Sequence, residues 1–591
     1  MLTTYLFSNR KTINLVTLIV IVVMATLACQ PSTSTLPETH TATAVSVTIP
    51  TPTVQVIPTN TPIPPTVAPS PTPVPPLSVW ISPGLPADLR SDIVHALTGT
   101  DSLIQFVSEL GSKTDIQFSH ALKHANTSNA SIFTRTYAIA APFPTVADSI
   151  TLASLIQFWH GDAAKLQYLT NDQSTPRLYV DQETLSGLEL IMGMPASTAP
   201  IVIVKPSELV DRLWASRPSS FAILPFDRLE VRLKLMMLDG LNLFEKATNM
   251  GDYPLRLIVT GNYSNLRAKK VVAALPASDN REVSKLAIVA MTGTTAMVRG
   301  TAVQMERKGL TYPGEAIRDW MLTADIRHVS NEVSFWDECP PPTFDDGVSM
   351  CSNPKYIDLL KYMGVNVVEL SGNHLWDKGS QYLSPTISLY KSLGWGVFAG
   401  GRTYSESIQP LTMTVAGNKL AFVGCNWFGS DWATEENGVA GSALCGLPDP
   451  RSLNMITATI HEMTSQGYTV IAAIQYQEYY QYDPYPQQEG DFKILRDAGA
   501  SIVNGSQGHW VQGFDVSASG FIHYGVGNLF FGDQEGEGTH QMFVDRHAFY
   551  DGHYLGVDLR SGYIIDYSRP EPMSLGERQK LLRVLFAATG Y

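Results

Sequence analysis

Oxygen-bearing and imidazole side chains follow several apolar stretches in the C-terminal half of the 591-residue chain. They stand at residues 292–295, 331–332, 371–374, 475–478 and 505–509. In open α/β sheets, ligands gather just beyond the carboxyl ends of the strands. Donors that converge from such distant places assemble a mononuclear or dinuclear metal site, at which an activated water attacks a phosphoester or amide bond. The pattern therefore predicts one polar site at a sheet edge.

The residue types suggest a role for each member of this predicted site. The catalytic candidates are Glu478, His509 and His374: Glu478 or His509 would shuttle protons, and His374 would orient the substrate together with Asn373. The candidates for holding a substrate are Asn331, Asn373, Asp377, Gln475, Gln507 and Asn528. The candidate ligands for one divalent metal ion are Glu332, Asn373, Glu478 and His509. Structural roles compete with these: His374 can cap a turn, Glu478 and Asp377 can be paired surface carboxylates, and Asn528 can shape a glycine-rich turn.

The elements that must position these residues repeat in β-α order. The expected strands are 286–290, 366–370, 420–423, 469–475, 501–504 and 521–524. The expected helices are 315–322, 356–363, 387–393, 455–464 and 492–498. Apolar residues recur at helical spacing within them, as Phe492, Leu495 and Ala498 do. Repeated β-α units predict a largely parallel sheet covered by helices, so the chain is expected to be an α/β protein.

The motifs of residues 281–565 resemble those of the CapA/PgsA-like poly-γ-glutamate capsule biosynthesis proteins. The matching pieces are Asn331-Glu332, Gly372-Asn373-His374 with Asp377 and Gly379, residues 498–509, and Tyr524-Gly-Val-Gly-Asn528-Leu529. The resemblance implies a metallophosphatase-like αββα sandwich. After it, residues 566–591 are expected to form a C-terminal helix or tail. It also implies a surface protein that binds or processes an extracellular anionic polymer or a cell-wall glycan.

Three departures from the family pattern weaken the predicted metal site. Thr294 stands where the family has an aspartate, and Gln475 and Gln507 stand where it has histidines. A dinuclear site needs anionic ligands to hold two dications close together. We therefore expect at most one weakly bound metal ion and little phosphodiesterase activity. An active metal-dependent phosphoesterase or amide hydrolase is the alternative.

Residues 78–280 predict an α/β region of their own. Apolar strands such as 201–204 and 221–224 alternate there with amphipathic stretches such as 151–159. Residues 151–161, 221–227 and 239–255 resemble pieces of extracellular solute-binding (periplasmic-binding-like) domains, which implies capture of a small solute. Two alternatives remain from the residues alone. Residues 78–280 can be an unrelated α/β spacer domain, and the whole chain can be a non-catalytic solute-binding protein.

The first 77 residues predict export and anchoring at the cell surface. Two basic residues precede the apolar run Leu15–Leu27, and Thr26-Leu-Ala-Cys29 resembles a bacterial lipobox, which implies lipidation at Cys29. The family prefers Leu in place of Thr26, so an uncleaved anchor helix within residues 1–29 stays open. Residues 30–77 are dense in Thr and Pro, which favours an extended stalk. We expect a lipid-anchored protein on the extracytoplasmic face of the cell membrane.

Charge and cysteine content agree with this location. The formal net charge is −13, with no run of Lys or Arg. Nucleic acid is therefore excluded as a partner, because its phosphates call for clustered positive charge. Two of the possible cysteine pairs are local, Cys339–Cys351 and Cys425–Cys445. We expect both to be disulfides of an oxidising compartment, with reduced, buried thiols as the alternative.

Overall fold

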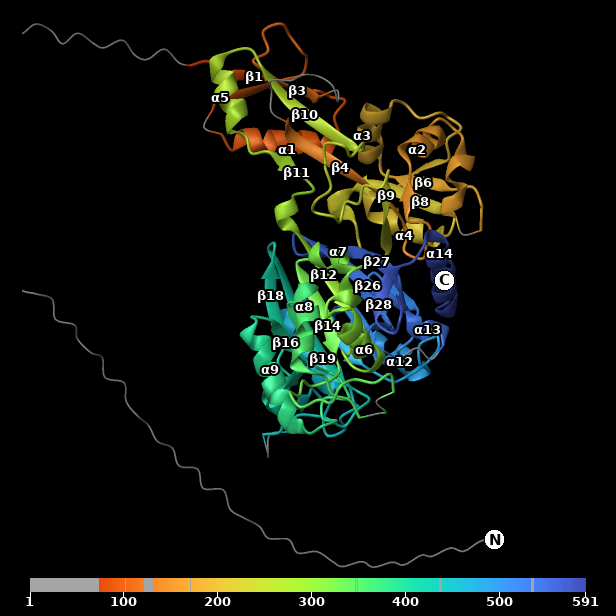
Figure 1. Ribbon diagram of the computed structural model, residues 1–591. Helices are drawn as coiled ribbons and strands as arrows, with labels where there is room; N and C mark the ends of the chain where they lie inside the picture. Colours follow the sequence, from red (N-terminus) through yellow and green to blue (C-terminus); the bar gives the residue numbers. More distant parts are fainter. Residues whose placement is uncertain are drawn as a thin grey trace, which may run out of the picture. The chain divides into compact units, whose positions relative to one another are not determined.

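Three large β-sheets organise the described part of the chain (Figure 1). The computed structural model describes residues 74–591 except for 101, 122–130, 171, 346, 348, 435–437 and 533–535. The predicted export segment with Cys29, and residues 30–73 of the predicted stalk, lie outside the described residues. Among the described helices, none has both the length and the apolar character needed to cross a membrane.

The first sheet has eleven strands and ends at residue 279. Its main path runs β2 (Ile104–Val107), β1 (Leu77–Ile81), β3 (Ile116–His120), β10 (Arg256–Tyr263), β4 (Ser131–Pro142), β8 (Ser220–Pro225), β6 (Arg177–Val180) and β7 (Ile201–Ile203), with β5 (Ser149–Ile150), β9 (Leu233–Leu238) and β11 (Ser278–Asp279) beside it. Its helices are α1 (Ala87–Thr98), α2 (Leu152–Trp159), α3 (Gln182–Met192), α4 (Leu209–Ala215) and α5 (Leu266–Ala274). Helix α2 begins where the Thr151 hydroxyl accepts from Ser154 N at 3.1 Å. The strands expected at 201–204 and 221–224 are confirmed as β7 and β8, and the amphipathic stretch 151–159 forms helix α2.

The second sheet has nine strands. Its order is β16 (Gly396–Phe398), β15 (Val367–Glu369), β14 (Ile326–Asn331), β12 (Leu286–Thr292), β26 (Gln541–Tyr550), β27 (His553–Ile565) and β28 (Arg569–Pro572), with the short strands β13 (Thr294–Thr295) and β25 (Asn528–Phe530) beside this path. Neighbours are parallel from β16 to β12 and antiparallel from β12 to β28. The parallel part carries the strand ends that were expected to bear the site.

The third sheet has six strands. Its order is β18 (Leu411–Val415), β19 (Asn418–Asn426), β21 (Thr469–Gln475), β22 (Ala500–Ser506), β24 (Gly520–His523) and β23 (Phe514–Ser517). The inner pairs are parallel and the two outer pairs are antiparallel. All six strands expected in the C-terminal half are confirmed in the second and third sheets.

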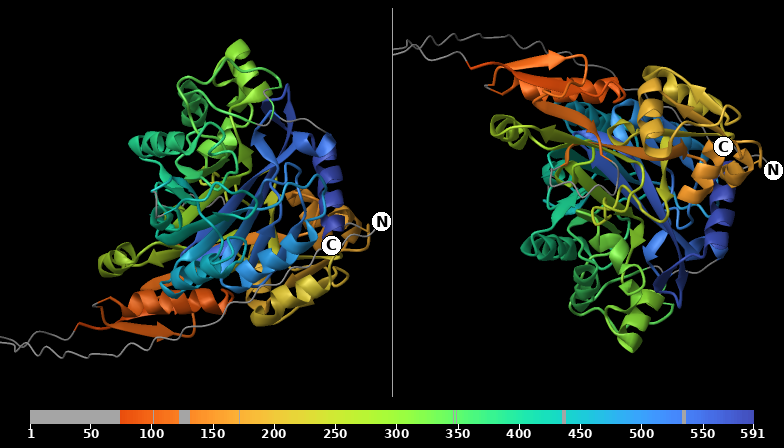
Figure 2. Two further views of the ribbon diagram at one scale, coloured as in Figure 1. Left: turned by 90° about the horizontal axis from the view of Figure 1, so that it is seen from below. Right: turned by 90° about the horizontal axis from the view of Figure 1, so that it is seen from above.

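The second and third sheets pack face to face, and helices cover their outer faces (Figures 1 and 2). Successive side chains of a strand point to opposite faces. On β12, Val289 therefore packs toward the third sheet, whereas Ile288 packs toward helices. The covering helices are α6 (Arg299–Lys308), α8 (Ile357–Tyr362) and α9 (Leu383–Ser392) on one side, and α11 (Asn454–Ser465) and α12 (Pro486–Asp497) on the other. The chain is a mixed α/β protein with several sheets.

One expected helix is shorter than its pattern suggested. Helix α7 covers only Arg318–Leu322, whereas residues 315–322 were expected to be helical. Residues Tyr312–Gly314 form a separate 3₁₀ turn, and Ile317, with φ of −118°, leaves the helical conformation between the two. The first turn of the expected helix is lost for this reason.

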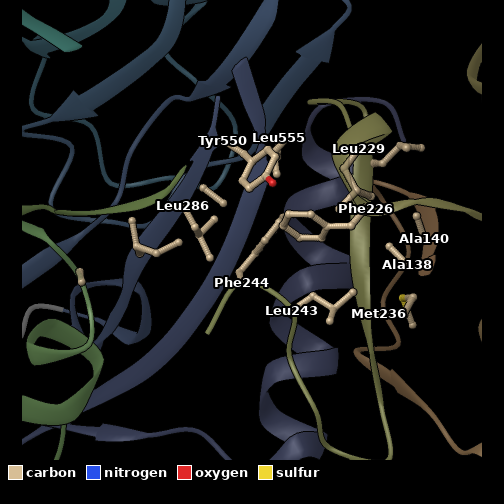
Figure 3. Packing of buried hydrophobic residues seen from close by; sticks show 14 of the residues in the cluster. Ala138, Ala140, Phe226, Leu229, Met236, Leu243, Phe244, Leu286, Tyr550 and Leu555 are labelled. Carbon is tan, nitrogen blue, oxygen red and sulfur yellow. The ribbon is translucent and has the colours of Figure 1, made fainter. Parts of the chain in front are cut away.

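Residues from both sides of position 280 share buried contacts. The ring of Phe226 lies 5.3 Å from that of Tyr550 on β26 and 6.4 Å from that of Phe244 (Figure 3). Helix α14 (Leu575–Ala588) begins with a capping box of Ser574 and Glu577, and its buried side chains join the same cluster as Phe143. The C-terminal helix thus packs against residues that precede the family-like region.

Both expected cysteine pairs are disulfides. Cys339 is bonded to Cys351, and Cys425 to Cys445. Stable disulfides belong to oxidising compartments, so the two bonds indicate an extracytoplasmic location.

We expect neither disulfide to yield free thiols when the protein is purified without reductant, unfolded and treated with iodoacetamide. Mass spectrometry should then find these four cysteines unalkylated, whereas prior reduction, the control, should make all four reactive. Replacing Cys425 and Cys445 together by Ala should lower the free energy of unfolding by about 3 kcal/mol, because the reduced loop regains conformational entropy. Quantitative alkylation of either pair before reduction would contradict the prediction.

Candidate functional site

The predicted polar residues meet at the carboxyl ends of strands from the second and third sheets. Glu332 follows β14, Gln475 ends β21, and His509 lies beyond β22. The backbone is tight where β12 ends, because a Cβ on Gly293 would lie 1.8 Å from the carbonyl oxygen of Gly527. Only glycine fits there, and the close approach sets strand β13 in register with β25. Residues that are far apart in sequence thereby line one edge.

The Gln475 side chain lies at the centre of this edge. Its Nε2 is 2.6 Å from Asn373 Oδ1, 2.8 Å from Gln507 Oε1 and 3.3 Å from Glu332 Oε1. An amide nitrogen carries two hydrogens, so three oxygen acceptors exceed what it can donate. Four of the predicted residues therefore form one hydrogen-bonded cluster, which we call the amide cluster (Glu332, Asn373, Gln475 and Gln507).

Several buried oxygens around the amide cluster have no hydrogen-bond partner among the described residues. They are Glu332 Oε2, Asn331 Oδ1, Gln475 Oε1 and Thr294 Oγ1. Glu332 is only 1% exposed. Burial raises the pKa of Glu332, the charges of His509 and His374 oppose this rise, and the charges of Glu478 and Asp377 add to it. Because buried polar groups are normally satisfied, these oxygens mark a place where a ligand with donors can bind.

His509 is held in one tautomer beside the amide cluster. Its Nδ1 lies 2.8 Å from Asn528 Oδ1, and Asn528 Nδ2 lies 3.4 Å from the carbonyl oxygen of Thr539. Asn528 Oδ1 is therefore the acceptor and Nδ1 carries a proton, so Nε2 is the nitrogen that can exchange a proton or a hydrogen bond with a ligand. The rings of Tyr480 and Phe531 stack on the imidazole at centroid distances of 6.0 Å and 4.9 Å. His509 can thus accept a proton or a hydrogen bond.

Glu478 is exposed and is tied to His509 through an aromatic side chain. The Tyr480 hydroxyl donates to Glu478 Oε1, and the ring of Tyr480, itself 37% exposed, stacks on His509. An exposed carboxylate beside an exposed ring suits contacts with a sugar or a peptide chain at the rim of the site.

A second ionisable pair borders the site. His374 Nδ1 lies 2.9 Å from Asp377 Oδ2, and Asp377 Oδ2 also accepts from Met350 N at 2.6 Å. Burial lowers the pKa of His374, but its bond to Asp377 and the charge of Glu332 outweigh burial, so the pKa lies above its ordinary value. The pair can donate a proton to a bound group.

Asp431 belongs to this border although it was not among the predicted residues. Burial raises its pKa to about 6, the charge of Asp377 adds to the rise, and a 3.0 Å bond from Trp376 N to Oδ2 opposes it. Asp431 follows strand β19, which was predicted, just as the other site residues follow theirs. It stands several positions beyond the end of that strand, so the strand-end rule did not single it out.

The donor set does not fit a pair of metal ions. Metal ligands present lone pairs, whereas Gln475 directs an N–H₂ group at three oxygens and Thr294 offers a neutral hydroxyl. Within the described part of the chain, no three His, Cys, Asp or Glu side chains lie close enough together to hold a metal ion.

Residues 288–533 match the family described as "Bacterial capsule synthesis protein PGA_cap". The likeness to capsule synthesis proteins that the sequence motifs indicate is therefore confirmed for this part of the chain. Two curated relatives carry the name CapA. The capsule biosynthesis protein CapA of Bacillus anthracis is 25% identical over 262 residues, which cover 43% of this chain and 61% of the relative. The PGA biosynthesis protein CapA of Bacillus subtilis is 23% identical over 190 residues, which cover 32% of this chain and 48% of the relative.

Solved structures show only distant likeness to this chain. An ABC-type phosphate transport receptor from Vibrio cholerae matches 33% of this chain and 92% of its own, with 13% identity and a TM-score of 0.26. A hypothetical protein from Thermus thermophilus matches 49% of this chain and all of its own, with 13% identity and a TM-score of 0.29. Scores at this level do not establish a shared fold.

Proposed function

We propose that this chain is a lipid-anchored surface protein of the capsule synthesis family that binds an extracellular polymer at the strand-end site rather than hydrolysing it. The observation that carries the proposal is the amide cluster. Where the family pattern has an imidazole, the Gln475 amide donates toward Asn373, Gln507 and Glu332. An uncharged amide, that of Gln475, thus stands at the position where the family pattern has a histidine that can bind metal.

The layered fold supports this assignment. Helices, two face-to-face sheets and helices are the layers of a metallophosphatase-like αββα sandwich, which the family resemblance implies. In this fold the strand-end site can bind a polymer. It does not offer the ligands that would hold the two metal ions with which a dinuclear hydrolase activates water. We propose at most one weakly held divalent ion, because the candidate ligands Glu332, Glu478 and His509 do not come together as a metal-binding group among the described residues.

The polar groups of the site suit a polymer rich in amide or hydroxyl groups. Unpartnered oxygens around the amide cluster accept hydrogen bonds, His509 Nε2 accepts another, and the exposed Tyr480 ring offers a stacking surface. Both poly-γ-glutamate, whose backbone is a chain of amides, and a cell-wall glycan present such groups. The two differ in charge, so salt dependence separates them.

The test is binding of immobilised poly-γ-glutamate and of a chitin oligosaccharide by the full chain. His509→Ala should weaken binding about tenfold, as loss of a central contact does. His461→Ala, an exposed histidine on α11, is the matched control and should bind as the unmodified chain does. Because the chain carries a net charge of −13, added salt should strengthen binding of poly-γ-glutamate by screening repulsion and should leave glycan binding unchanged. Failure to bind either polymer would overturn the proposal, as would equal binding by both variants.

An active hydrolase is the second candidate, and one observation favours it. Asp431, whose pKa burial raises to about 6, interacts electrostatically with His374 and Asp377 and is therefore protonated in part near neutral pH. Such a group can act as a general acid. Turnover of a phosphodiester or amide substrate at rates on the order of 1–1,000 per second would favour this candidate over binding.

A further inference from the structure

A cavity of about 290 Å³ lies between strands β9 and β27 and helix α14. Lys234 and Met237 come from β9, Arg560 from β27 and Arg578 from α14, so the lining joins residues from before and after position 280. None of the amide-cluster residues lines it. Its volume is close to the lower end of the range of about 300–1,000 Å³ for small-molecule pockets, which occur preferentially at such junctions.

One wall of the cavity is a buried charged network centred on Asp148. Lys234 Nζ lies 2.7 Å from Asp148 Oδ1, and Arg578 donates through Nε at 2.7 Å to Oδ2 and through Nη2 at 2.9 Å to Oδ1. Burial alone would raise the pKa of Asp148, but these two cations hold it well below its usual range. Burial also lowers the pKa of Lys234 to about 8. The Asp148 carboxylate is therefore fully occupied by cations.

A second charged group completes the wall. Asp558 Oδ2 accepts from Arg560 through Nε at 2.9 Å and Nη2 at 2.7 Å, and from Asn242 Nδ2 at 3.2 Å. Arg560 also contacts Glu245 at 3.1 Å, and Glu245 is shared with Arg546 at 3.1 Å. This network therefore has four cations, Lys234, Arg546, Arg560 and Arg578, and three carboxylates, Asp148, Asp558 and Glu245, which leaves one excess positive charge. A guanidinium has five N–H donors, and Arg578 uses three of them, the third toward Ser561 Oγ at 3.2 Å. Donors thus remain for another acceptor.

The rest of the lining is mostly apolar and partly aromatic. It includes Phe143, Phe244, Trp320, Met573 and Phe586. Phe244 is held in place by its contact with Phe226 (Figure 3).

We propose that this cavity binds a small organic monoanion, which carries a carboxylate on an apolar or aromatic body. The ligand joins the two parts of the chain that line the cavity. The carboxylate meets the spare guanidinium donors, and the body packs on the rings.

Titration calorimetry of the full chain with three probes of one shape tests the charge requirement. Phenylacetate should bind about tenfold or more tightly than phenylacetamide, and phenethylamine, a cation, should not bind. Phenylacetate should also raise the melting temperature, because a ligand of the folded state stabilises it by mass action. Absence of binding by millimolar phenylacetate would overturn the proposal, as would equal binding of all three probes.

Three variants locate the binding. Arg560→Met removes the excess charge and should weaken phenylacetate binding about tenfold. Arg583→Met, an exposed arginine on the same helix as Arg578, is the control and should bind normally. Met573→Trp keeps every charge but fills the cavity, so it should abolish binding while the chain stays folded by circular dichroism. The proposal fails if Met573→Trp binds phenylacetate as the unmodified chain does, or if the two arginine variants behave alike.

Discussion

Replacing Thr294 by Asp and both Gln475 and Gln507 by His should raise the metal content of the purified protein from at most one divalent ion per chain toward two. The three changes turn a neutral hydroxyl and two amides into a carboxylate and two imidazoles at the strand-end site. Anionic and imidazole ligands are what two dications need in order to lie close together. Elemental analysis after dialysis against the metal-containing buffer measures the change.

The triple variant should also depend on metal for stability. Thr294 is fully buried, so an aspartate there carries an unpaired charge unless a cation binds. Chelation should therefore lower the melting temperature of the variant and leave that of the unmodified chain nearly unchanged. Gln466→His, at the exposed end of α11, is the control for an added imidazole and should take up no metal. If the triple variant holds no more metal than the unmodified chain, the metal positions inferred from the family pattern are wrong.

Glu332→Gln should stabilise the protein at neutral pH by roughly 1–3 kcal/mol, the range for a buried group left without a partner. Burial raises the pKa of Glu332 in the folded state. A raised folded-state pKa contributes stability that is full below the unfolded value of about 4.3 and is lost as pH rises through the folded value. At pH 7 the buried Glu332 therefore lowers the free energy of unfolding relative to its value at low pH, whereas glutamine has the same shape and no ionisable group.

Urea unfolding at two pH values measures this effect. The advantage of Glu332→Gln over the unmodified chain should be present near pH 7 and shrink toward pH 4, where the glutamate is itself protonated. Glu478→Gln is the matched control, because Glu478 is exposed and its replacement should change stability by less than about 0.5 kcal/mol. A variant less stable than the unmodified chain at pH 7 would show that Glu332 is compensated by a partner.

The strand-end residues were predictable because their strands are parallel and apolar. The expected strand over 469–475 is β21 itself, and its last residue, Gln475, is the centre of the amide cluster. The rule failed for Asp431 because the polar residue stands several positions beyond the end of β19, in a loop whose course only the fold determines. Local sequence patterns indicate where a strand ends. They do not indicate which residues of a long loop come back to the site.

The long antiparallel strands β26 and β27 were not predicted, and their buried charges explain why. Three consecutive ionisable residues normally indicate an exposed segment. In β26, however, such a run is fully buried: Asp545, Arg546 and His547. Asp545 pairs with His523 at 2.5 Å, and Arg546 pairs with Glu245 at 3.1 Å, 301 residues away in the chain. Such partners, like Asp148 for Arg578, are set by tertiary packing and leave no local signal.

The central claim is that the strand-end site has exchanged metal ligands for amides and binds polymer without a metal pair. Elemental analysis of the unmodified full chain, purified without chelator and dialysed, tests it most directly. We expect at most one weakly held divalent ion per chain, lost on further dialysis. Two tightly held ions per chain would contradict the claim, because they would require ligands that Thr294, Gln475 and Gln507 do not supply.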